Sequence, residues 1–166
     1  MKLDFVIIGA QKSASSYLHE LIADHPDIYM PKDETPYFQD PDFNETILED
    51  YLDLEAANDA KCIGIKRPNY IGIDNIPERI FNHNSNCIII AVLRNPLDRF
   101  VSNFFHNISY CFAPNIDINL AIPKIINKDK SLLENYPGVS EIIENGMYSK
   151  YLSKYLNFFS KKNLLV

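Results

Sequence analysis

The sequence predicts an α/β fold of three layers, in which helices flank a parallel β-sheet. Two segments carry this prediction, residues 3–24 and residues 87–107, because each runs from an apolar strand through a short turn into a helix. Parallel strands need a crossover connection, and such a helix supplies one. A length of 166 residues corresponds to about one domain. We therefore expect residues 1–166 to form a single α/β domain.

The first of these segments opens with a short apolar strand. Leu3–Ile8 is rich in strand-forming residues, and Gly9 closes the run. Ser13–Asp24 then has helical spacing. Its apolar residues recur on one face, at Leu18, Leu21 and Ile22. Pro26 ends this helix, since proline disfavours helical geometry in the residue before it.

The middle of the chain is predicted to add one more strand and two helices. Ile28–Phe38 is expected to be irregular or briefly extended, because it contains two prolines. Glu45–Leu54 indicates a modest helix. Cys62–Lys66 alternates in the manner of a strand, and Ile76–His83 is predicted to be helical.

The second strand–turn–helix segment contains the most β-branched run of the chain. Cys87–Leu93 is typical of a strand buried on both faces of a parallel sheet. Pro96–Asn107 follows as a helix with proline in its first turn, where the missing N–H costs nothing. Residues 112–137 indicate a helix and loops, and Val139–Glu144 is a short helix candidate.

The last part of the chain predicts an amphipathic helix and the start of a strand. Aromatic and leucine side chains recur at helical spacing over residues 148–159, which predicts packing into the core. Asn163–Val166 has the character of the first residues of another strand. We expect an element to be cut there.

Composition excludes several classes of protein. The chain has 16 Lys and Arg against 22 Asp and Glu, a net charge of −6, which argues against a nucleic-acid partner. Its apolar runs are far shorter than the roughly 20 residues of a membrane span. No signal-peptide pattern opens the chain, so a cytoplasmic location is expected. Three separated cysteines, expected to be reduced and mostly buried, and four scattered histidines indicate no metal site.

The turn after the first strand predicts an anion site. Residues 9–16 read GAQKSASS, which places glycine, lysine and hydroxyls between a strand and a helix start. The N–H groups at a helix N-terminus carry partial positive charge and favour a phosphate or a similar oxyanion. Lys12 adds a full charge, and Ser15 and Ser16 add donors. The alternative is an ordinary tight turn with a solvated lysine.

The turn after the 87–93 strand presents a second set of basic residues. Only two residues separate Gly9 from Lys12, so the spacing of the nucleotide triphosphate loop is absent. Arg94 also stands where a magnesium-dependent nucleotide site would have an acidic residue. The planar guanidinium of Arg94 suits a phosphate. Ser102 reaches the same anion if the helix starts at the site. The alternative makes Arg94 and Arg99 surface ion-pair partners of Asp98 or Glu78.

These two turns together resemble those of the sulfotransferases that use 3′-phosphoadenosine 5′-phosphosulfate. Residues 5–18, FVIIGAQKSASSYL, look like the 5′-phosphosulfate loop of that family. Residues 92–102, VLRNPLDRFVS, resemble its 3′-phosphate motif R-x-P-x-x-R-x-x-S. The resemblance implies a P-loop-like fold and this donor as co-substrate. It assigns the 5′-phosphosulfate to Gln11, Lys12, Ser13, Ala14, Ser15 and Ser16, and the 3′-phosphate to Arg94 and Ser102.

Three later segments resemble the heparan-sulfate-type branch and its bacterial relatives. Residues 32–38, KDETPYF, are similar to a K-E-x-x-F-F segment, and residues 66–70, KRPNY, resemble K-[ST]-P-x-Y. Residues 145–148, NGMY, also look like that branch. The resemblance implies Glu34 as the general base, with Lys12 and Lys66 acting on the sulfuryl group. A carboxylate that accepts the acceptor's proton and fixed cations near the leaving oxygen suit this chemistry.

The sequence therefore predicts a sulfotransferase that acts on a hydroxyl or amine of a small molecule or carbohydrate, with no metal. Ala14 stands where the family often has glycine, and relatives continue past residue 166. The expectation is thus a domain that lacks the family's C-terminal portion. Two alternatives stay open at this point: a P-loop kinase or NTPase, and a truncated, catalytically silent adenine-nucleotide binder. The acceptor's identity and the oligomeric state are not predicted.

Overall fold

The computed structural model describes the backbone of residues 1–166 and every side chain except that of Glu45. The chain packs as two compact units. The first contains residues 1–93 and 149–166, and the second contains residues 94–148. Each unit is described below by itself, and the grouping of residues 1–166 as one domain stays a prediction.

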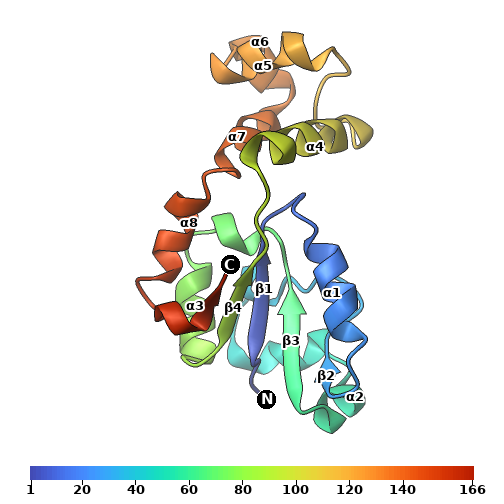
Figure 1. Ribbon diagram of the computed structural model, residues 1–166, viewed down its shortest axis with the longest axis vertical. Coiled ribbons are helices and arrows are strands. Elements are labelled where there is room, and N and C mark those ends of the chain that lie inside the picture. Colours follow the sequence, from blue (N-terminus) through green and yellow to red (C-terminus); the bar gives the residue numbers. More distant parts are fainter. The chain divides into compact units, whose positions relative to one another are not determined.

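The first unit is built on a parallel sheet of five strands in the order β2-β3-β1-β4-β5 (Figure 1). The strands are β1 (Phe5–Gly9), β2 (Ile28–Tyr29), β3 (Cys62–Lys66), β4 (Ile88–Ala91) and β5 (Leu164–Leu165). All four strands expected from the sequence form, including the last, which pairs with β4. The central strand β1 is buried along its whole length.

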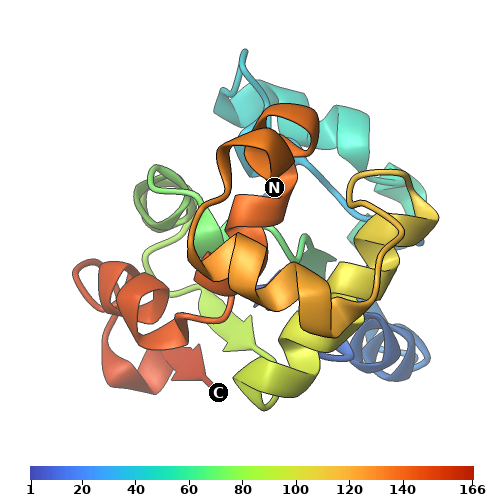
Figure 2. The ribbon, with the colours of Figure 1, turned by 90° about the horizontal axis from the view of Figure 1, so that it is seen from above.

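Helices cover both faces of this sheet, which confirms the predicted three-layer α/β fold. Figure 2 shows α1 (Ser15–Ala23) on one side, and α3 (Ile76–His83) and α8 (Tyr148–Tyr155) on the other. Under α1, Phe5, Ile7 and Met30 form a buried cluster. The predicted bounds of α3 agree with the structure.

The segment between β2 and β3 differs from its prediction. Residues 45–51 form a 3₁₀-helix, η2 (Glu45–Tyr51), and a separate helix, α2 (Leu54–Asp59), follows it. Asp53 caps α2 by accepting hydrogen bonds from the N–H groups of Glu55 and Ala56. This cap starts a new helix at the position where the sequence was expected to end one.

The burial of three side chains was not predicted from the sequence. Leu21, which shares the apolar face of the first helix with Leu18 and Ile22, is 53% exposed, whereas His19 is buried. The cysteines are free, as expected, but Cys111 is exposed, while Cys87 is buried. Burial raises the pKa of the Cys87 thiol to about 12.

The second unit consists of helices. It contains α4 (Pro96–Ser109), α5 (Ile118–Ile126), α6 (Lys130–Asn135), the 3₁₀-helix η4 (Pro137–Ser140) and α7 (Glu141–Glu144). These helices pack around their own apolar cluster, with Phe104, Ala121 and Val139 at its centre. The expected helix over residues 139–144 is thus a 3₁₀ turn followed by one α-helical turn. None of the helices that the structure describes, in either unit, combines the length and the apolar character needed to cross a bilayer.

Candidate functional site

The loop that follows β1 starts from a backbone conformation that requires glycine. Gly9 has a φ of +143°, and a Cβ at this position would lie 2.5 Å from the carbonyl oxygen of Pro68. The next loop residue, Ala10, donates its N–H to Val92 O at 2.8 Å, and Gly9 O accepts from Val92 N at 2.7 Å. The loop therefore leaves the sheet at the carboxyl end of the central strand, which is where parallel α/β sheets bind ligands.

The loop then exposes the N-terminus of α1. The N-cap of this helix is Ala14, which has no side chain able to accept from the first N–H groups. Lys12 and Ala14 both adopt positive φ, 61° and 66°. Within the described part of the chain, the Ser13 hydroxyl is buried without a hydrogen-bond partner. Uncapped N–H groups, an orphaned hydroxyl and a lysine in one loop make a site that an oxyanion completes.

Lys66 brings the predicted catalytic residues together. It ends β3, the neighbour of β1, and its side chain is only 5% exposed. Its Nζ donates to Ser16 Oγ at 3.0 Å and lies 3.3 Å from Glu34 Oε1. The structure thus joins the anion loop to Glu34 through one buried lysine. These three residues come from separate segments of the sequence, and all belong to the first unit.

Arg67 holds the other oxygen of Glu34, a contact that the sequence analysis missed. Its Nη1 lies 3.1 Å from Glu34 Oε2, and its Nε donates to Gln39 Oε1 at 2.7 Å. Arg67 also donates its backbone N–H to Ile7 O, which fixes it beside the end of β1. Its position directly after Lys66, at the end of a strand, was the available signal. Gln11 is also tied to this region, by a short hydrogen bond to Asn69.

Hydrogen bonds on both sides hold the segment that carries Glu34. His19 bonds through Nε2 to Pro31 O at 2.9 Å. Thr35 donates its N–H to Lys66 O at 3.0 Å, and Thr35 O accepts from the Tyr70 hydroxyl at 2.7 Å. Glu34 itself stays 39% exposed. The segment therefore presents an accessible carboxylate from a fixed backbone.

Burial shifts the pKa of two groups that support this segment. Desolvation lowers the pKa of His19 from 6.5, and the charge of Lys66 lowers it further. Burial raises the pKa of the Tyr70 hydroxyl, so that it stays a hydrogen-bond donor. His19 is consequently neutral at pH 7 and donates its Nε2 proton to Pro31 O.

The second predicted anion turn lies in the second unit and is built differently from the first. Arg94 is exposed and opens this unit, and the Tyr148 hydroxyl donates to its carbonyl oxygen at 3.0 Å. Asn95 caps α4, since its Oδ1 accepts from the N–H groups of Leu97 and Asp98. Ser102 is half-buried two turns into that helix. An anion here would depend on side chains, because Asn95 already occupies the helix N-terminus.

Arg99 is not a surface residue, contrary to one alternative reading of the sequence. Its side chain is fully buried, and its Nη2 donates to Ile142 O. The cause is its place on the inner face of α4, which packs against α7. Among the described side chains, His, Cys, Asp and Glu do not form any group of three that could hold a metal ion.

Comparison with known proteins identifies the class of this α/β protein. The family model described as a sulfotransferase domain matches residues 2–166. The chain belongs to the sulfotransferase family.

Individual relatives agree with this assignment. The human heparan sulfate glucosamine 3-O-sulfotransferase 3B1 is 27% identical over 161 residues, which cover 96% of this chain and 39% of that protein. The membrane-associated sulfotransferase kil1 of Dictyostelium discoideum is 29% identical over 110 residues, 64% of this chain and 23% of that protein. The chain thus spans less than half the length of these curated relatives.

A solved structure shows the same fold. The sulfotransferase from Alicyclobacillus acidocaldarius matches with a TM-score of 0.75 at 21% identity, over 99% of this chain and 72% of that one. The predicted family and fold class are both confirmed by these comparisons.

Proposed function

We propose that this chain transfers a sulfuryl group from 3′-phosphoadenosine 5′-phosphosulfate to a hydroxyl or amine acceptor. The observation that carries the proposal is the contact of Lys66 with both Ser16 of the anion loop and Glu34. One buried cation thereby links a loop suited to an oxyanion with a carboxylate suited to deprotonating an acceptor. Membership of the sulfotransferase family supports the same reaction.

The residues of the first loop fit the phosphosulfate end of this donor. The orphaned Ser13 hydroxyl and the uncapped N-terminus of α1 offer donors to its oxygens. Gln11, Lys12, Ala14, Ser15 and Ser16 complete the proposed binding loop. When bound, the donor supplies a sulfuryl group attached to a phosphate leaving group. Arg94 and Ser102 of the second unit are proposed to hold the 3′-phosphate.

In the proposed reaction, the protein's own groups move one proton and stabilise one charge. Glu34 accepts the proton of the acceptor hydroxyl or amine at a carboxylate oxygen, and its exposure allows the acceptor to approach. Lys66 and Lys12 place positive charge where the leaving oxygen gains negative charge, which lowers the barrier. Arg67 and Lys66 fix the direction of the carboxylate. We propose no metal for this chemistry.

The alternatives fit the residues less well. A magnesium-dependent kinase or NTPase needs the longer phosphate loop and an acid after a buried strand, and neither is present here. A catalytically silent nucleotide binder gives no reason for the contact between Lys66 and Glu34. Related proteins named for heparan sulfate glucosamine act on a carbohydrate. We propose a carbohydrate or small-molecule acceptor, and the cytoplasmic location stays a prediction.

The test follows label from the sulfur-labelled donor into a panel of amino sugars, oligosaccharides and aromatic alcohols. We expect Glu34→Gln to lower kcat by about 10²–10⁴-fold, the usual contribution of a general base. Binding of 3′-phosphoadenosine 5′-phosphate should be unchanged in that variant, because Glu34 is proposed to act on the acceptor and its ion pairs are with Lys66 and Arg67. Asp33→Asn, an exposed neighbouring carboxylate, is the matched control and should keep full turnover. Full turnover in Glu34→Gln would remove Glu34 from the mechanism.

A further inference from the structure

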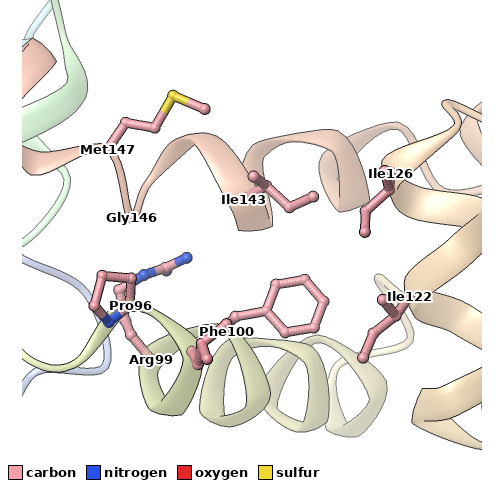
Figure 3. Close-up of a pocket in the computed structure, with 9 residues that line it drawn as sticks. Pro96, Arg99, Phe100, Ile122, Ile126, Ile143, Gly146 and Met147 are labelled. Atoms are coloured by element: carbon pink, nitrogen blue, oxygen red, sulfur yellow. The ribbon is translucent and has the colours of Figure 1, made fainter.

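The second unit contains a pocket that the proposed reaction does not use. It has a volume of about 370 Å³ and lies between α4, α5 and the turn after α7 (Figure 3). Pockets that hold small ligands begin at about 300 Å³. Its lining includes Arg99, Phe100, Ile122, Ile143, Gly146 and Met147. All of them except Arg99 lack polar side-chain groups, so the pocket suits the hydrocarbon part of a ligand.

Arg99 places an uncompensated positive charge against this apolar lining. Its side chain is 0% exposed. Nη2 donates to Ile142 O, but within the described structure Nε and Nη1 are buried and have no hydrogen-bond partner. Burial lowers the pKa of the guanidinium, yet arginine stays protonated in proteins. A buried cation without a counter-charge is costly, and an anion bound beside it would remove that cost.

The turn at Gly146 packs against the guanidinium of Arg99. A Cβ on Gly146 would lie 3.4 Å from Arg99 Nε and 3.6 Å from Nη2, so this turn covers one edge of the side chain. Figure 3 shows the guanidinium extending from α4 toward the turn. Binding of an anion to the covered N–H groups requires this turn to shift away from α4, and the conformational freedom of glycine permits such a shift. The neighbouring Met147 is exposed and flexible at the rim.

We propose that this pocket binds an amphiphilic organic anion, with its carboxylate or sulfate on Arg99 and its alkyl chain along Phe100, Ile122 and Ile143. The charge of Arg99 selects the anionic head, since a neutral head leaves Nε and Nη1 unpaired. The apolar lining favours a ligand with an alkyl chain, because a small inorganic anion would make no contact with this lining. The site lies wholly within residues 96–147. Pro96 and Arg99 belong to the 3′-phosphate motif, but the residues of that motif assigned to the phosphate are Arg94 and Ser102.

The test compares octanoate with 1-octanol and acetate on the full chain. Octanoate has both the charge and the chain, and each control has only one of them. We expect octanoate to bind at least tenfold more tightly than either control in calorimetric titrations. The protein has three methionines, and a methyl-labelled NMR sample should show octanoate shifting Met147 while Met1 and Met30 stay unchanged. Equal affinity for octanoate and 1-octanol, or shifts only at Met1 or Met30, would contradict the proposal.

Two variants test the charge of Arg99 and the open volume of the pocket separately. In Arg99→Met, octanoate should lose its advantage over 1-octanol, and a retained advantage would overturn the role of Arg99. Because this variant also loses the bond to Ile142 O, Ile143→Trp serves as the second variant. It leaves Arg99 in place but fills the pocket, so both ligands should bind at least tenfold more weakly. Unchanged octanoate binding in a folded Ile143→Trp protein would place the ligand elsewhere.

Discussion

Glu34 is held by two cations from consecutive residues, and this pairing fixes the direction of the carboxylate that we propose as the general base. Lys66 takes one oxygen and Arg67 the other. Because consecutive residues of a strand point to opposite faces, the contact with both requires the chain to turn directly after Lys66. Pro68 follows, and Arg67 N is bonded to Ile7 O. The resemblance identified Glu34 and Lys66, whereas Arg67 could not be found from it because that position carries Ser or Thr in the related motif.

His19 was also missed, for a different physical reason. A histidine between a leucine and a glutamate reads as a polar helix position, and its burial depends on the distant carbonyl of Pro31. Helical periodicity reports which residues share a face, but not which partner a polar side chain will find. Tertiary contacts therefore determine that His19 is buried.

His19 should make the stability of the protein depend on pH. Its pKa is lowered in the folded chain, so the unfolded chain binds a proton first as the pH falls below 6.5. The free energy of unfolding therefore decreases on acidification. The contribution of His19 to that free energy is complete above pH 6.5 and is lost as the pH falls below it. In His19→Gln, which keeps a donor for Pro31 O, this part of the dependence should disappear. Urea unfolding at a series of pH values from 7 to 5 measures it.

The control for this prediction is His25→Gln, at an exposed histidine just after α1. It should keep the wild-type pH dependence. An unchanged dependence in His19→Gln would show that other groups cause the acid sensitivity.

Among the secondary-structure elements, the sheet was predictable and the loop-rich segments were not. Apolar β-branched runs such as residues 88–91 specify buried parallel strands, and all four expected strands formed. The stretch from Glu45 to Asp59 was harder, because Asp53 divides it into a 3₁₀-helix and an α-helix through local caps. Both anion turns were predicted from the sequence, but the difference between their helix starts was not. They differ because Asn95 caps α4 itself, whereas Ala14 cannot cap α1.

Ala14 should be a point of local strain at the start of α1. It adopts the left-handed region with φ 66°, which costs a residue with a Cβ about 1–2 kcal/mol and glycine almost nothing. Ala14→Gly should therefore raise the free energy of unfolding by about 0.5–1 kcal/mol after the entropy of glycine is included. Chemical denaturation measures this change.

The same substitution at a helical position should act in the opposite direction. Ala56 is exposed within α2, and Ala56→Gly should lower the free energy of unfolding by about 0.5–1 kcal/mol. Destabilisation by both substitutions would show that the Ala14 conformation carries no strain.

Although the whole molecule is acidic, several positive charges lie near the anion loop of its first unit. The net charge is −6, yet Lys66 and Arg67 meet a single carboxylate close to the loop that carries Lys12. The proposed anionic donor would thus be attracted by these local groups and not by the electrostatic field of the whole protein. In the helical second unit, Arg94 and Ser102 are proposed to hold the 3′-phosphate, and the same unit contains the Arg99 pocket. One chain of 166 residues would then hold two different kinds of anion.

The most direct test of the proposed donor site measures thermal unfolding with 3′-phosphoadenosine 5′-phosphate and, separately, with ATP and magnesium. At a hundred times its Kd, a ligand that binds only the folded chain should add about 2.7 kcal/mol. We expect this effect from the bisphosphate and not from ATP, with its loss in Lys12→Ala and Arg94→Ala and its retention in Lys2→Ala. Stabilisation by ATP with magnesium and none by the bisphosphate would contradict the account.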